Sequence, residues 1–185
     1  MYKLCTTEAA AERQRLLENQ LKELLTLREY GRINVSSFCQ FAGIPRKTFY
    51  RYFSGMDGAL YALLDHTLLD MNWNPLQWLR EEEEDLRREL EALFTLWQAR
   101  RDLLDAMAQS RLETVLMERA LICAFRGPQA EVFHFRPDPG SPEEMAVCCM
   151  VYTLITWQRS GFRKSAGQIA GELTGLLRNP LARRE

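Results

Sequence analysis

The chain has few of the residues that build metal sites, disulfide frameworks or catalytic centres. Its 185 residues include five cysteines, an odd number without a C-x-x-C pair, and only two histidines, His66 and His134, far apart in sequence. This content argues against a disulfide framework and against a metal site, and we expect no cofactor. No nucleophile motif or glycine-rich phosphate loop occurs, which argues against an enzyme. A catalytic dyad assembled only by the fold stays open as an alternative.

Long apolar runs are also lacking. The first residues have no apolar stretch of the kind found in signal peptides. The most apolar run, residues 145–157, has 13 residues and is too short to cross a bilayer. We therefore expect a cytoplasmic protein without a membrane partner.

Strand-like alternation is nearly absent, whereas helical spacing of apolar residues is frequent. Leu17, Leu21, Leu24 and Leu25 predict an amphipathic helix over about residues 8–30, ended by Gly31. Similar patterns predict about nine helices and an all-α fold, with the longest loop over residues 127–140. Ser141 followed by Pro142 then predicts the start of another helix.

The net charge of −1 is unevenly distributed. Residues 1–56 carry nine Lys or Arg against five Glu, a net charge of +4, so the remainder carries −5. A basic head on an acidic body is typical of a protein whose one end meets a polyanion.

Residues 34–53 have the layout of a helix-turn-helix, in which two short helices meet at a turn that Gly43 makes possible. Apolar residues are spaced to pack the two helices together: Val35, Phe38, Ala42, Ile44 and Phe49. Polar and basic residues are expected outward on the second helix, where they could meet bases and phosphates: Arg46, Lys47, Thr48, Tyr50, Arg51 and Tyr52. An ordinary helical hairpin with a solvated basic face is the alternative.

Residues 42–53, AGIPRKTFYRYF, resemble the recognition helix of the TetR family of transcriptional regulators, whose pattern is A-G-[VI]-x-x-x-[TS]-[LF]-Y-x-[HY]-F. The similarity extends over about residues 12–65. It implies an all-helical homodimer with an N-terminal three-helix helix-turn-helix domain, residues 8–56. It also implies a helical effector-binding and dimerisation domain, residues 57–185.

The resemblance further implies which residues meet the DNA: Asn34, Ser36, Arg46, Lys47, Thr48, Tyr50, Arg51 and Tyr52. Phe49 and Phe53 are expected in the core. The family often has a lysine just after the motif where this chain has Met56, and Asn34 replaces the usual threonine. Affinity is therefore expected to depend more on the basic residues of the second helix.

Two helices near the C-terminus have patterns that favour a dimer. The predicted helix over about residues 142–160 is apolar almost all round, so it is expected to be buried on two sides. In the last helix, small residues share one face, where glycines would be unfavourable unless two backbones approach closely. The predicted dimer interface comprises Cys148, Val151, Tyr152, Ile155, Gly167, Ala170, Gly171, Thr174 and Gly175. A solvent-facing terminal helix is the alternative.

Four tryptophans and several methionines in the C-terminal part could line an apolar effector pocket, and the candidates are Trp97, Met107 and Tyr152. Ordinary core residues are the alternative for each of them. The adjacent Cys148 and Cys149 are interpreted as inert small apolar residues, with redox sensing as the alternative.

Together these patterns predict a dimeric transcription regulator, in first place a repressor, that binds a palindromic operator in double-stranded DNA. A small, mostly apolar effector that the sequence does not identify would release it. One alternative keeps DNA binding but gives the C-terminal domain a protein partner. Another is a helical adaptor without DNA binding.

Overall fold

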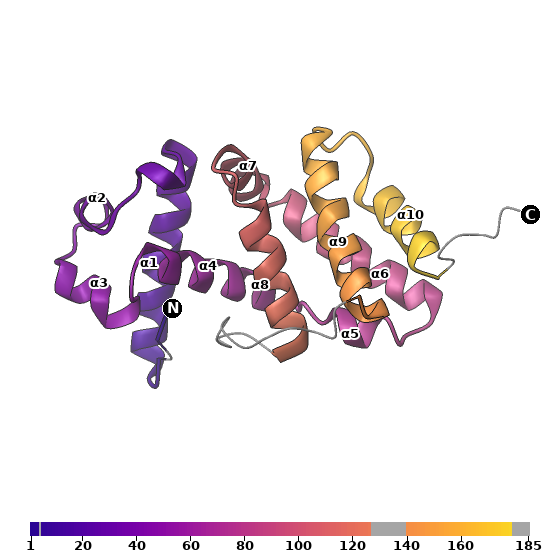
Figure 1. Ribbon diagram of the computed structural model, residues 1–185, viewed down its shortest axis with the longest axis horizontal. Coiled ribbons are helices and arrows are strands. Elements are labelled where there is room, and N and C mark those ends of the chain that lie inside the picture. Colours follow the sequence, from indigo (N-terminus) through magenta and orange to yellow (C-terminus); the bar gives the residue numbers. More distant parts are fainter. Residues whose placement is uncertain (4, 127–139, 179–185) are drawn as a thin grey trace, which may run out of the picture.

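The computed structural model describes residues 1–3, 5–126 and 140–178, and these residues form an all-helical protein (Figure 1). In chain order the elements are α1 (Glu8–Leu27), the 3-10 turn η1 (Tyr30–Arg32), α2 (Val35–Phe41), α3 (Arg46–Tyr52), α4 (Met56–Asp70), α5 (Pro75–Trp78), α6 (Glu83–Gln98), α7 (Arg101–Gln109), α8 (Glu113–Arg126), α9 (Pro142–Arg159) and α10 (Ala166–Arg178). The all-α prediction is confirmed. The described residues have one α-helix more than the predicted nine, since α5 forms a separate turn. The predicted loop, apart from Gly140, lies outside the described residues.

Helix α1 is shorter than predicted. Thr7 caps its N-terminus by accepting a hydrogen bond from the Ala10 N–H, and its leucines at i, i+4, i+7 and i+8 are buried. The helix ends at Leu27 because Arg28 adopts extended backbone. Gly31 therefore does not end the helix but lies within η1.

The first three helices enclose an aromatic core. Phe38 of α2 and Phe49 of α3 are fully buried and meet edge to face, with ring centroids 5.5 Å apart. Phe49 also contacts Phe53, at 5.3 Å. Aromatic pairs of this kind add about 0.5–1.5 kcal/mol to the burial of their apolar area. The prediction that Phe49 and Phe53 are core residues is confirmed.

Helix α4 runs from this head into the rest of the molecule (Figure 1). It is buried on most sides and packs against both α1 and α8, while α1 also packs against α7. Tyr30 adds polar links: its N–H donates to Ser110 Oγ at the end of α7, and its hydroxyl donates to Asp57 of α4 at 2.6 Å. Burial and the Asp57 carboxylate raise the pKa of Tyr30, so the phenol stays a donor.

The remaining helices form a second packed region, in which α6 and α10 pair closely and α9 lies against α8 and α10. Phe94 of α6 and Trp157 of α9 are buried together, with centroids 5.6 Å apart. Within the described ranges, no helix combines the length and apolarity that crossing a membrane requires.

Candidate nucleic-acid interface

The turn between α2 and α3 has the geometry that the helix-turn-helix prediction required. Gly43 adopts φ +62°, in the left-handed region that favours glycine. Helix α2 begins at a reciprocal cap, in which Asn34 Oδ1 accepts from the Ser37 N–H and Ser37 Oγ accepts from the Asn34 N–H. The side-chain oxygen of Asn34 is thus used in the cap, whereas its amide nitrogen is not.

Helix α3 presents basic and hydroxyl groups to solvent. Arg46, Lys47 and Arg51 are exposed, and the side chain of Tyr50 is 48% exposed. The opposite side of α3 carries Phe49, which fixes the helix on the aromatic core. Exposed donors on a rigidly packed short helix are what major-groove recognition needs.

Three other predicted contacts differ in accessibility. Ser36 is exposed and contacts the Arg46 guanidinium, so that α2 and α3 contribute to one polar surface. Thr48 is half-buried. Tyr52 was predicted to point outward from α3, and this is wrong. The residue is only 7% exposed, because the last turn of α3 packs toward residues 1–3 and Phe53.

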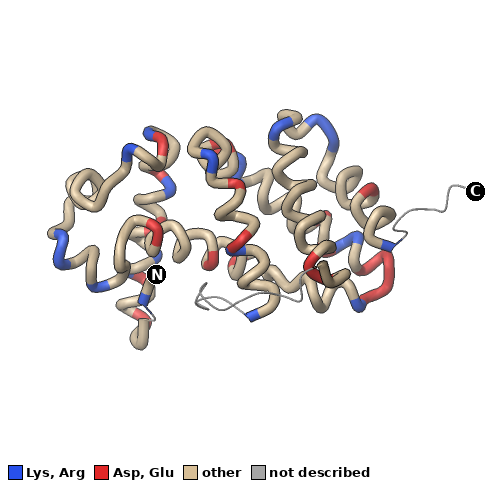
Figure 2. The backbone as a smooth tube through the Cα atoms, in the orientation of Figure 1, with Lys and Arg blue, Asp and Glu red and all other residues tan. Residues whose placement is uncertain are grey.

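The charge of this surface is of one sign. Residues 34–56 include three basic residues and no aspartate or glutamate. Figure 2 shows the Lys and Arg positions of α3 at one end of the molecule, apart from the acidic positions of the body. Attraction to phosphates is therefore not offset on these two helices.

Comparisons with solved structures find the same fold in two proteins described as regulators. The chain is similar to the fatty acid degradation regulator FadR from Bacillus halodurans, with a TM-score of 0.57 and 16% identity over 92% of this chain and 97% of that one. It is also similar to the dihydroxyacetone kinase operon activator DhaS, with a TM-score of 0.53 and 16% identity over 90% and 94% of the two chains. No family model matches the sequence. No curated protein matches it either. At this identity the likeness establishes the fold alone, which is the all-helical fold of these two structures.

The residues predicted for the dimer interface do not share one exposed face. Tyr152 is 61% exposed, and Gly171 and Gly175 face open space, with nothing within 4 Å of an added Cβ. Cys148 is half-buried. Four others are buried within this chain, which corrects the prediction for them: Val151, Ile155, Ala170 and Thr174.

The correction has a physical cause in the pairing of α10 with α6. Ala170 and Thr174 lie on the buried side of α10, and a Cβ on Gly167 would come within 2.9 Å of the Glu91 carboxylate of α6. These small residues allow close packing inside the chain. Two apolar residues of these helices are also exposed, Met145 of α9 at 60% and Leu176 of α10 at 52%.

The predicted effector residues do not line one pocket. Trp97 is buried and lines a cavity of about 10 Å³ in the body, together with residues of α4, α8 and α9. Met107 is buried but does not line this cavity, and Tyr152 lies on the outer side of α9. About one water molecule would fill such a volume, so the body is closed here to a drug-sized ligand.

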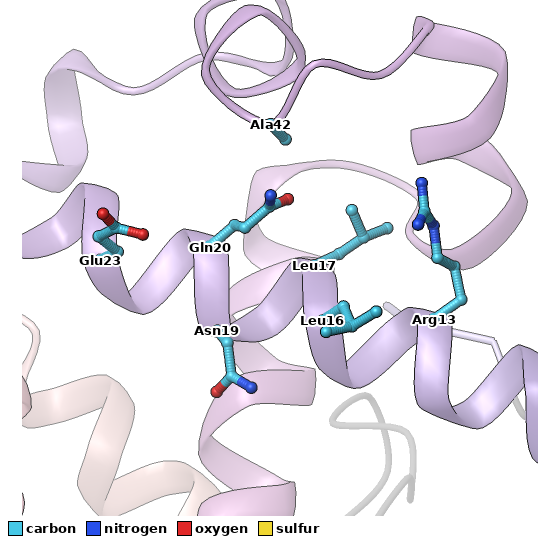
Figure 3. Close-up of a pocket in the computed structure, with 7 residues that line it drawn as sticks. All are labelled: Arg13, Leu16, Leu17, Asn19, Gln20, Glu23 and Ala42. Atoms are coloured by element: carbon cyan, nitrogen blue, oxygen red, sulfur yellow. The ribbon is translucent and has the colours of Figure 1, made fainter.

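Larger clefts lie beside α1 instead. One, of about 270 Å³, is lined by α1 residues and Ala42, and Figure 3 shows Arg13 and Gln20 rising toward Ala42 while Asn19 points away. Another, of about 430 Å³, lies between α1, α4 and Arg100 at the start of α7. Both are open to solvent and carry charges of both signs, which does not suit the apolar effector predicted from the sequence.

Proposed function

We propose that the chain is a TetR-like transcription regulator that binds a palindromic operator as a homodimer. The single observation that carries this proposal is the exposed row of Arg46, Lys47, Tyr50 and Arg51 on a short helix fixed by Phe49. The fold neighbours, both transcription regulators, support it and favour a non-enzymatic role. The proposed DNA-binding domain is residues 8–56, the proposed effector and dimerisation domain residues 57–185, and the proposed location the cytoplasm.

Selection from random double-stranded DNA tests this proposal. At low salt the full chain is expected to enrich one near-palindromic sequence, because a two-fold dimer imposes its symmetry on the operator. Affinity for that sequence is expected to fall steeply with salt, with log K changing by about −0.9 per phosphate contact for each unit of log salt. Failure to enrich any sequence would favour a helical adaptor without DNA binding. Enrichment of a single half-site would leave DNA binding but remove the dimer.

The direction of regulation is part of the proposal. The sequence pattern favours a repressor, whereas one fold neighbour is described as an operon activator. A reporter gene placed behind the selected operator decides between them: repression lowers and activation raises its transcription when the chain is supplied.

A second copy of the chain is the proposed partner of the exposed side of α9 and α10. Met145, Tyr152 and Leu176 are more than half exposed on these adjacent helices, and Gly171 and Gly175 leave room for a close backbone approach. Met145 and Tyr152 are seven residues apart and so lie on the same exposed side of α9, and large exposed apolar side chains mark interaction sites in soluble proteins. A self-complementary face of this kind suits a symmetric dimer.

A small apolar effector is proposed to enter by separating the helices around the cavity lined by Trp97. Such a ligand, at a concentration about one hundred times its Kd, is expected to raise the Tm by about 5–10 °C and to quench tryptophan fluorescence. The ligand is also expected to release the operator. It can do so only if it binds the conformation that does not bind DNA more tightly than the conformation that does.

The closed body favours a second candidate, a regulator of the same fold whose C-terminal part binds a protein. The observation behind it is the cavity volume of about 10 Å³. If a diverse apolar library neither shifts the Tm nor releases DNA, the protein-binding candidate gains and the small effector is excluded.

A further inference from the structure

Residues 1–3 lie along the C-terminal end of α3 and pair with residues 52–54. The Lys3 N–H donates to the Tyr52 carbonyl at 2.9 Å, and the Ser54 N–H donates to the Met1 carbonyl at 3.0 Å. Tyr2 and Phe53 form an antiparallel bridge between them. Lys3 Nζ also donates to the carbonyl of Tyr50. We call residues 1–3 the strap.

Gly58 of α4 makes room for the strap. A Cβ at this position would lie 2.1 Å from the Met1 carbonyl oxygen and 2.8 Å from its carbon, both backbone atoms. No side-chain rotation could relieve that overlap. The backbone of the strap therefore lies between the C-terminal end of α3 and the first turn of α4.

The side chain of Tyr2 continues from the strap into a buried polar cluster. Its hydroxyl donates to Asp65 of α4 at 2.7 Å, and Asp65 receives two hydrogen bonds from the Arg119 guanidinium of α8. Asp65 and Arg119 are at most 2% exposed. Burial, followed by the Asp65 charge, raises the pKa of Tyr2 and keeps its hydroxyl a donor.

Helix α8 carries Arg119 between two residues of the body cavity. Leu116 and Ala120 line the cavity, and the Ala120 carbonyl accepts from Trp73 Nε1 at 2.9 Å. A displacement of α8 that opens the cavity must move the Arg119 guanidinium. Because Arg119 donates to Asp65 and Asp65 accepts from Tyr2, that displacement reaches the end of α3 through a continuous chain of hydrogen bonds.

We infer that Tyr2 is a positioning residue for DNA recognition: the strap fixes the orientation of α3, and the Tyr2–Asp65–Arg119 cluster makes that orientation depend on α8. The inference rests on the proposed DNA-binding function. Tyr2, Asp65 and Arg119, which thereby acquire a role in DNA recognition, all lie outside the helix-turn-helix of residues 34–53.

Tyr2→Phe tests it in the full chain, because phenylalanine keeps the ring and Arg119 still pairs with Asp65. The expected result is a loss of about tenfold in affinity for the selected operator, the lower end of what a lost hydrogen bond to a buried carboxylate produces. Affinity for random duplex should change by less than about twofold, because phosphate attraction does not require one exact orientation of α3. Hydrogen exchange of the α3 amides, measured without DNA, should become faster while exchange in α6 is unchanged.

Gly58→Ala provides a second variant, with Gly55→Ala as its matched control. Alanine has a higher helix propensity than glycine, so the substitution should not lower the Tm by weakening α4. The added Cβ does, however, force the strap to move. Nothing lies within 4 Å of a Cβ at Gly55, whose extended backbone any residue adopts. We expect Gly58→Ala to reproduce the effects of Tyr2→Phe and Gly55→Ala to bind like the unaltered chain.

The outcomes separate this inference from the function on which it rests. If the unaltered chain enriches an operator and Tyr2→Phe and Gly58→Ala bind it equally well, the inference is overturned and the function stands. Equal losses for operator and random duplex would also overturn it, since they indicate a lost phosphate contact rather than a changed orientation. If the unaltered chain binds no DNA, the proposed function fails. Unchanged hydrogen exchange of the α3 amides in Tyr2→Phe would then also overturn the inference that the strap fixes the orientation of α3.

Discussion

Arg46→Ala and Lys47→Ala are each expected to weaken operator binding by about 1–3 kcal/mol. The double variant is expected to lose more than either one, but not the exact sum, because the effects of adjacent residues are coupled. Both side chains are exposed at the start of α3, and Arg46 also contacts Ser36 of α2. If the lost contact was to a base edge, the variant should show a relaxed sequence preference at one position of each half-site. If it was to a phosphate, the salt dependence of log K should become less steep by about one.

Fluorescence anisotropy with the selected operator and with random duplex, at several salt concentrations, measures these effects. Arg80→Ala is the matched control, because Arg80 is an exposed arginine of the body, far along the chain from α3. Tyr50→Phe should weaken binding to both duplexes alike if its hydroxyl meets phosphate. Equal affinity of the double variant and the unaltered chain would remove α3 from the interface and with it the helix-turn-helix proposal.

The head could be predicted well because its fold depends on local patterns. Gly43 is the residue that a sharp turn requires, and the spacing of Phe38 and Phe49 is enough to place both in one core. Tyr52 was misplaced because its burial depends on the strap, which is about 50 residues away in sequence. No local pattern in residues 42–53 distinguishes a tyrosine facing DNA from one covered by residues 1–3.

The body was predicted less well, for a related reason. Helical spacing shows which residues of α10 share a face, but it does not show which face meets the same chain. Of the five small residues predicted to face a partner, Ala170 and Thr174 are buried within the chain and Gly167 faces Glu91 of α6, so only Gly171 and Gly175 stay open. The pairing of Asp65 with Arg119 was equally hidden, because 54 residues separate the two partners.

The small volume of the cavity beside Trp97 could not be predicted from residue types. Tryptophans and methionines fill space as readily as they line a pocket, and here Trp97 and Met107 are both about 1% exposed. A pocket is a property of how helices are spaced, which residue type does not determine. The same residues can therefore be core in one conformation and pocket lining in another.

Gly171→Leu is expected to shift the proposed dimer towards monomer and to lower operator affinity by about 10²–10⁴-fold, the contribution of joining two binding units. Within one chain the position is open, so the added side chain meets nothing there. Against a second copy it would overpack a backbone contact at a typical cost of about 1–3 kcal/mol, incurred once in each subunit. Sedimentation measures the change of mass, and circular dichroism should show unchanged helix content.

The control for this last variant is Gly31→Leu, at another glycine whose Cβ would meet nothing but which lies in η1. It should leave the sedimentation coefficient unchanged. If Gly171 instead faces solvent, leucine should stabilise α10 by about 1 kcal/mol as the better helix former and raise the Tm. An unchanged dimer with a raised Tm would therefore exclude Gly171 from the interface and leave the exposed side of α9, with Met145 and Tyr152, as the surface that joins the two subunits.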